Sequence, residues 1–137
     1  MKVRFPYQMR SPTAGHASLA PLLQLALSRG TKSAPVSGLL DSGAAINVLP
    51  FEVGLRLGAV WEQQTTVLQL AGNLSQYEAR GLILTAIVAG FTPVQLAFAL
   101  TAARNIPPIL GQLNFFMEFD VCFFRHDLAF ELTQRPA

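Results

Sequence analysis

An apolar segment interrupted by a single carboxylate is the feature that most constrains how this chain folds. The run SGLLDSGAAINVLP, residues 37–50, places Asp41 directly after two leucines and before a Ser-Gly pair. Apolar stretches on both sides, 36–40 and 45–48, predict two buried strands joined by a tight loop. The loop would hold Asp41 at the mouth of a hydrophobic interior, where bulk water alone no longer sets its protonation. A carboxylate in that position is suited to activating a water molecule.

A second segment lies late in the chain. Residues 106–111 read IPPILG, and the following stretch 113–119 is predicted to form a short helix. Gly111 has no Cβ, so another backbone can approach it closely. Asp-Ser-Gly alone is common in ordinary turns, where Asp41 would simply be an Asx-turn residue. The two segments together are more specific than either one.

Together, Asp41-Ser42-Gly43-Ala44 and Ile109-Leu110-Gly111 resemble the two signature segments of the retropepsins, the retroviral-type aspartic proteases. The resemblance covers roughly residues 17–133. It implies an all-β fold, a retropepsin-like closed barrel or sandwich with one short C-terminal helix and one Asp-Ser-Gly lobe per subunit. It also implies that Asp41 is the catalytic residue and that Ser42, Gly43 and Ala44 brace its loop. The strand that ends at Gly111 is expected to cross close beside that loop, as the corresponding strand does in the family.

The chain carries one such signature and no internal repeat, whereas pepsin-type enzymes carry two in one chain. Peptide hydrolysis by this mechanism needs two carboxylates that share a proton, because like charges about 3 Å apart do not readily both ionise. The resemblance therefore implies an aspartic endopeptidase that works as a homodimer, with two copies of Asp41 meeting on the two-fold axis. No metal or cofactor is expected, and the expected partner is a peptide or protein substrate.

The resemblance also places a substrate cleft and a mobile flap. Many retroviral members carry acidic residues where this chain has Ala45 and Ile46, so apolar side pockets are expected here. The flap would be a hairpin, with a strand at 65–70 and an exposed return at 75–80. The expected substrate-binding residues are Ala45, Ile46, Val48, Ile109, Leu110 and Gly111, and the expected flap residues are Leu70, Ala71, Gly72, Asn73 and Leu74.

A high apolar content leaves surface to be covered by a subunit interface or a bilayer. Hydrophobic residues make up 51% of the 137 residues, and the stretch 81–103 is uncharged and long enough to span a membrane. Gly90-Phe91-Thr92-Pro93 is turn material, however, and divides that stretch into two halves of strand length, 82–89 and 94–101. A buried hairpin is therefore predicted, with no membrane span. Without a convincing export signal, a cytoplasmic location is expected.

The charged residues, the two histidines and the single cysteine do not indicate a further functional site. The net charge of +2 is too small to indicate a nucleic-acid surface, although five cations precede Asp41. Residues 1–16 are expected to form a flexible, irregular arm before one domain at 17–137, with attraction to an acidic partner or lipid surface as the alternative role of the cations. His16 and His126 show no metal-ligand spacing, and Cys122 is expected to be a buried structural thiol.

The remaining pattern predicts a strand at 18–27, a turn at 28–33, a helical turn at 51–57 and a hairpin formed by 121–124 and 128–132. The resemblance implies that this apolar C-terminal segment joins a sheet shared between subunits. A runner-up interpretation is a catalytically silent dimerisation or peptide-binding module that keeps the fold, with Asp41 as a remnant. A membrane anchor at 81–103 is a third interpretation.

Overall fold

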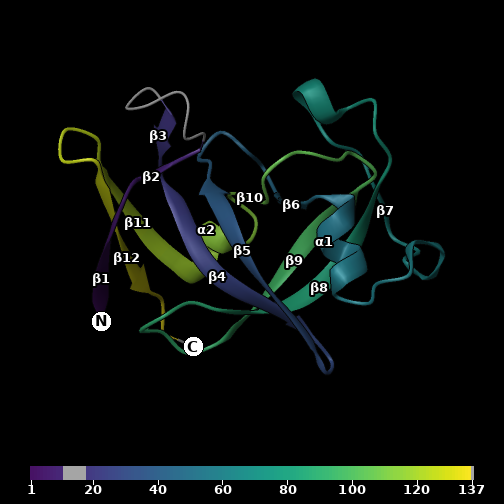
Figure 1. The fold of residues 1–137 in the computed structure, drawn as a ribbon, viewed down its shortest axis with the longest axis horizontal. Helices are drawn as coiled ribbons and strands as arrows, with labels where there is room; N and C mark the ends of the chain where they lie inside the picture. The colour runs from purple at the N-terminus through teal and green to yellow at the C-terminus, as the bar shows by residue number, and fades with distance from the viewer. Residues whose placement is uncertain (11–17, 137) are drawn as a thin grey trace.

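The computed structural model describes residues 1–10 and 18–136, and Figure 1 shows its arrangement. The strands are β1 (Lys2–Pro6), β2 (Gln8–Met9), β3 (Leu19–Ala20), β4 (Leu22–Arg29), β5 (Lys32–Leu40), β6 (Asn47–Leu49), β7 (Val67–Leu68), β8 (Ala79–Ile87), β9 (Val94–Thr101), β10 (Ile109–Leu110), β11 (Phe119–Phe124) and β12 (Ala129–Gln134). The helices are α1 (Phe51–Arg56) and α2 (Phe115–Glu118), with 3₁₀ turns at Trp61–Gln63 and Gly72–Leu74.

Six strands close into a barrel. Neighbouring strands follow the order β4-β5-β10-β6-β9-β8, and β8 pairs back onto β4 through Ala26–Ile87, Leu27–Ala86 and Ser28–Thr85. The short strand β7 adds to the beginning of β8. Closure leaves no free edge in the ring, which is one of the ways that antiparallel proteins avoid exposed ladders. The predicted all-β barrel architecture is confirmed.

Two long hairpins build most of this barrel. The first joins β4 and β5 through Gly30, whose φ of +60° suits a residue without a side chain. The second joins β8 and β9 along eight paired positions, as predicted for the uncharged stretch. The membrane-anchor interpretation of residues 81–103 is therefore wrong, because those residues form barrel strands. Within the described residues, none of the helices has the length and apolar run needed to cross a membrane.

Alternation along the strands fills the barrel. Leu82, Leu84 and Ala86 of β8 are buried, whereas the residues between them are partly or fully exposed. Phe98 of β9 lies inside among the leucines of β4. Helix α1 packs near β5 and β9 and ends at Arg56, two residues before Gly58, whose φ is +74°. The helical turns predicted near 51–57 and 113–119 are thus confirmed as short helices.

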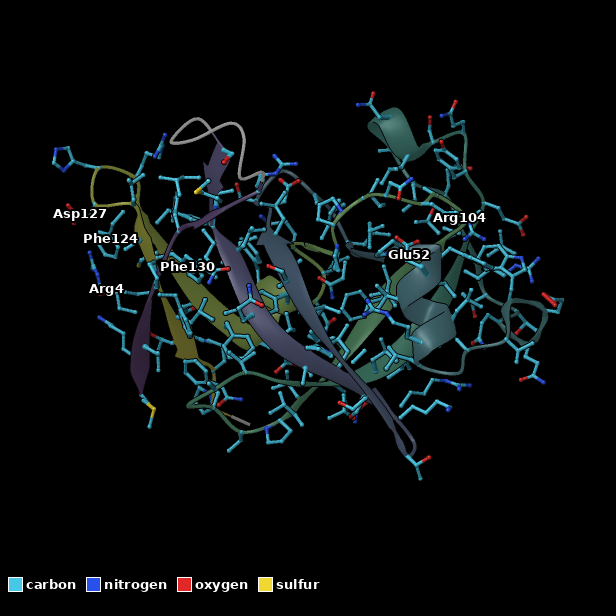
Figure 2. The ribbon with its side chains drawn as sticks, in the orientation of Figure 1. Arg4, Glu52, Arg104, Phe124, Asp127 and Phe130 are labelled. Atoms are coloured by element: carbon cyan, nitrogen blue, oxygen red, sulfur yellow. The ribbon has the colours of Figure 1, made fainter. Side chains whose placement is uncertain are left out.

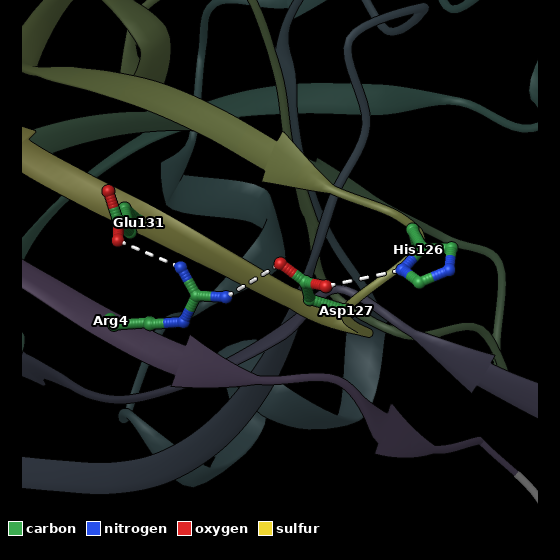
Figure 3. A network of polar contacts seen from close by, with 4 residues as sticks. All are labelled: Arg4, His126, Asp127 and Glu131. Atoms are coloured by element: carbon green, nitrogen blue, oxygen red, sulfur yellow. Dashed lines mark hydrogen bonds and ion pairs between the residues drawn. The ribbon is translucent and has the colours of Figure 1, made fainter.

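The N-terminal segment is not the irregular arm that was expected. Strand β1 pairs antiparallel with β12 over five positions, from Lys2–Thr133 to Pro6–Ala129, and β2 pairs with β3. Arg4 contacts Glu131 at 3.0 Å and Asp127 at 3.3 Å, and Figure 3 shows both contacts. Phe5 stacks on the buried Phe130, which Figure 2 labels, with ring centroids 5.3 Å apart. The rest of the expected arm, residues 11–16, lies outside the described residues.

The C-terminal strand is enclosed by its own chain. β12 lies between β1 and β11 in a three-stranded sheet, so both of its edges are already paired. The predicted hairpin of 121–124 with 128–132 is confirmed by the β11–β12 ladder. Within the C-terminal segment expected to join a sheet shared between subunits, β11 keeps an open edge among the described residues, as does β1 on the other side of β12.

Two further expectations need correction. Cys122 is exposed on β11 and is not a buried thiol, because β11 is an edge strand with one face toward solvent. The strand expected at 65–70 shrinks to Val67–Leu68, and the one expected at 18–27 is interrupted at Pro21, which has no N–H for a ladder.

Candidate active site

The two sequence segments that carried the resemblance lie side by side. Strand β10 runs parallel to β5, with Ile109 opposite Leu39, and antiparallel to β6, with Ile109 opposite Val48. The Asp41 N–H donates to the Leu110 carbonyl oxygen at 3.0 Å. The late Ile-Leu-Gly segment therefore fits between the two strands that flank the Asp loop, and it fixes the backbone of Asp41.

The loop orients the Asp41 carboxylate. The Gly43 N–H donates to Asp41 Oδ1 at 3.0 Å, and the Ala44 N–H donates to the Asp41 carbonyl oxygen at 3.1 Å. The side chain of Asp41 remains partly accessible at the end of β5. Ser42 is exposed, and its carbonyl oxygen accepts a hydrogen bond from Gln112 Nε2 at 2.8 Å. The carboxylate is thus oriented on one side and open on the other.

Gly111 occupies the close crossing that the sequence predicts. A Cβ at this residue would lie 2.6 Å from the Ile46 carbonyl oxygen and 2.8 Å from that of Ala44. Real side chains do not approach backbone oxygens so closely, so no other residue fits without displacing the loop. Gln112 and Leu113 continue the contact, donating their N–H groups to the carbonyl oxygens of Ala44 and Ala45 at 2.9 and 2.8 Å.

A buried amide that the sequence reasoning missed ties these segments together. Asn47, with no exposed surface, accepts the Gly111 N–H on Oδ1 at 2.8 Å. Its Nδ2 donates to the Ala97 carbonyl oxygen at 3.0 Å and to Asn114 Oδ1 at 3.1 Å. A polar residue in the otherwise apolar stretch 45–49 was the available signal, because a buried amide must find partners.

We expect Asn47→Ala to lower the free energy of unfolding by about 2–3 kcal/mol, because it leaves the buried Gly111 N–H without an acceptor. Urea denaturation measures this change. Gln24→Ala is the matched control: Gln24 also makes two side-chain hydrogen bonds, to Gln8 and Ser37, but on the surface. Equal losses in the two variants would contradict a special role for the buried amide.

Apolar residues expected to bind substrate gather beside the loop. Val48 is buried in a small cluster outside the barrel core, against which Ile46 and Ile109 pack. A cavity of about 420 Å³ adjoins this cluster and is lined by Ile46, Leu68 and Leu113, among others. Ala45 is exposed, and Gly111 is buried at the crossing. Leu110 is different: it is fully buried in the barrel core, so it supports the loop from beneath and lines no surface.

The expected flap is compact and only briefly paired. β7 and β8 share two positions, Val67–Arg80 and Leu68–Ala79, and the chain between them contains the 3₁₀ turn Gly72–Leu74. Gly72 has a φ of +64°, as a tight turn requires. Ala71, Gly72 and Asn73 are exposed, whereas Leu70 is buried in the same cluster as Val48. Figure 1 shows this turn rising at the end of the barrel where β5 ends.

The chain is similar to known proteins in its structure but not in its sequence. No family model and no curated protein sequence matches the chain. The crystal structure of a retropepsin-like aspartic protease from Rickettsia conorii is similar, with 12% identity, a TM-score of 0.68, and coverage of 96% of this chain and 90% of that one. The retroviral protease-like domain of Ddi1 from Leishmania major is similar at 16% identity and a TM-score of 0.58, covering 86% of this chain and 91% of that one.

A third solved structure, EIAV protease in complex with an inhibitor, has 21% identity and a TM-score of 0.50, covering 68% of this chain and 82% of that one. The three proteins share a description as retroviral-type proteases or protease-like domains. This chain has the retropepsin-like aspartic protease fold.

Proposed function

We propose that this protein is a homodimeric aspartic endopeptidase in which Asp41 from each of two chains forms the catalytic pair. The observation that carries the proposal is the oriented, half-open Asp41 carboxylate, which the Gly43 N–H contacts at 3.0 Å at the crossing of the two signature segments. The fold shared with retropepsin-like proteases supports the same conclusion.

In the proposed mechanism the pair holds one proton. The ionised Asp41 takes a proton from a water molecule, and the resulting hydroxide attacks the carbonyl carbon of the peptide bond. The neutral Asp41 of the second chain gives its proton to the carbonyl oxygen. When the carbon–nitrogen bond breaks, the amine leaves with a proton returned by the pair. One chain alone supplies one such carboxylate and therefore half of the site.

The exposed apolar surface beside the loop is consistent with a subunit or substrate contact. Leu113 and Met117 are 55% and 63% exposed, and both follow directly on the Gly111 crossing. Leu113 lies against the Asp41 loop, where its N–H donates to the Ala45 carbonyl oxygen, so an exposed apolar side chain there suits such a contact. In a dimer built this way, the open edges available to a shared terminal sheet are those of β1 and β11.

A peptide library incubated with the protein at acid and neutral pH, and read by mass spectrometry, tests the proposal. Cuts made by the wild type and absent with Asp41→Asn would establish the endopeptidase and its side-chain preference. No cuts from a verified dimer at any pH would overturn the proposal. The protein would then be a silent module with the retropepsin fold.

Dilution is expected to lower the specific activity once the protein concentration falls below the dimer dissociation constant, because a monomer holds only one Asp41. Cleavage of one peptide should be followed across a wide range of enzyme concentrations, alongside the molar mass from light scattering. Covalently linking two chains should remove the dependence. A specific activity that stays constant while the molar mass halves would contradict a shared site.

A further inference from the structure

A second hollow lies on the face of β5 that leads to Asp41. Its volume is about 530 Å³, and it is lined in part by Pro35, Ser37 and Pro108. Side chains alternate along a strand, so the exposed Pro35 and the half-buried Ser37 share one side of β5, and Asp41 follows directly after the last residue of that strand. The buried Val36 between them also contributes to the lining. The Leu39 N–H donates to the Pro108 carbonyl oxygen at 2.8 Å, which fixes the wall of the hollow to the strand that carries Asp41.

Two arginines give this hollow its charge. Arg10 and Arg56 line it, both are exposed, and neither forms an ion pair or a side-chain hydrogen bond among the described residues. Other cations in the described part of the chain do have partners: Arg4 contacts Glu131, Arg80 contacts Glu78, and Arg135 contacts Asp120.

Among the described residues, no carboxylate lines the hollow to neutralise the two guanidinium groups. Glu52 of α1, labelled in Figure 2, is next to the lining residue Val53 but does not itself line the hollow; its Oε1 accepts the N–H of Asn105 at 3.4 Å, and its Oε2 is buried without a hydrogen-bond partner among the described residues. The remaining lining is largely apolar and includes Ile106 and Met9. Two exposed guanidinium groups beside an apolar lining suit a peptide that carries a carboxylate among apolar side chains.

We propose that this hollow binds an acidic side chain of the substrate, and the proposal rests on the endopeptidase function proposed above. Ser37 precedes Asp41 by four strand positions, which correspond to about 13 Å at roughly 3.3 Å per residue. An extended substrate covers the same length in about four residues. The preferred Asp or Glu would therefore stand about four residues from the scissile bond.

The test compares pairs of fluorogenic peptides that differ only by Glu or Gln at the third, fourth or fifth position on either side of the cleaved bond. The wild type should prefer one Glu peptide by about 2- to 30-fold in kcat/KM, as expected for two exposed charge pairs. The preference should shrink in 0.5 M salt. The double variant Arg10→Gln/Arg56→Gln should cleave the Glu and Gln peptides equally. Arg125→Gln is the matched control, because Arg125 is exposed and stacks on Tyr7 outside the hollow.

A binding assay separates this proposal from the proposed function. Asp41→Asn protein and a labelled Glu peptide are followed by fluorescence anisotropy, with and without the two arginine changes. Arginine-dependent binding of the Glu peptide supports the cationic site even if no peptide is ever cleaved. Cleavage without any Glu preference overturns the site while leaving the endopeptidase intact. Arginine-dependent binding to phosphatidylserine vesicles or to an RNA oligonucleotide, without Glu-peptide binding, also overturns it.

Discussion

Asp41→Asn is expected to reduce peptide cleavage by at least about 10³-fold. The substitution replaces both carboxylates of the pair with amides, so no group remains to take a proton from water. The substitution is close to isosteric. Asn keeps an oxygen that accepts the Gly43 N–H now bound by Asp41 Oδ1 at 3.0 Å, so the loop and the fold should persist. Kinetics on a single peptide at acid and neutral pH measure the loss.

Asp120→Asn provides the matched carboxylate-to-amide control. Asp120 is exposed on β11 and pairs with Arg135 at 3.0 Å, outside both signature segments. Its activity should equal that of the wild type. Circular dichroism and light scattering should show the same fold and molar mass for both variants. Full activity in Asp41→Asn would remove Asp41 from the chemistry altogether.

Gly111→Ala is expected to have the largest effect on stability, lowering the free energy of unfolding by about 3 kcal/mol. The added Cβ would meet the carbonyl oxygens of Ile46 and Ala44 at 2.6 and 2.8 Å. These backbone atoms have little room to move, because neighbouring groups of the loop are hydrogen-bonded to Gln112 and Leu113. The strain would displace the Asp41 loop, so cleavage should fall together with stability. Urea denaturation and peptide kinetics on the same samples measure both effects.

Gly81→Ala is the control that tests whether replacing a glycine at another position also destabilises the protein. A Cβ at Gly81 would lie 3.4 Å from Thr66 Cβ, an ordinary contact, and Gly81 lies inside a strand. That variant should be unchanged or up to about 1 kcal/mol more stable, because alanine loses less backbone entropy on folding. If Gly111→Ala were equally harmless, the close crossing would not be what positions Asp41.

Local patterns predicted the elements whose neighbours lie close in sequence. The hairpin of β8 and β9 follows from two apolar halves around a Gly-Phe-Thr-Pro turn, and α1 follows from a short segment that Gly58 ends. The crossing at Gly111 was implied by the resemblance to the retropepsins, and the absence of a Cβ at this residue is compatible with it. Asn47 is the one polar residue in an apolar stretch, which is a signal of a buried amide. No local rule, however, predicts which groups such an amide binds.

The expectations that were wrong concern segments whose structure depends on residues distant in sequence. Lys2 to Pro6 became a strand because β12, more than a hundred residues later, offers it a paired edge and Phe130 offers Phe5 a stacking surface. Cys122 is exposed because β11 ended as an edge strand, which its apolar neighbours Val121 and Phe123 did not reveal. Residues 65–70 lost most of their expected strand because the chain at Leu70 packs inward beside Val48.

The sequence by itself determined a single Asp loop, its companion Ile-Leu-Gly segment and the apolar alternation of a closed barrel, since each depends on nearby residues and on the chemistry of individual side chains. Only the tertiary structure decided which strands close the ring, what holds the Asp41 loop, and where Arg10 and Arg56 come together beside Pro108. The physical reason is that these contacts join residues tens of positions apart. Their energies depend on burial and backbone geometry, which exist only once the chain has folded.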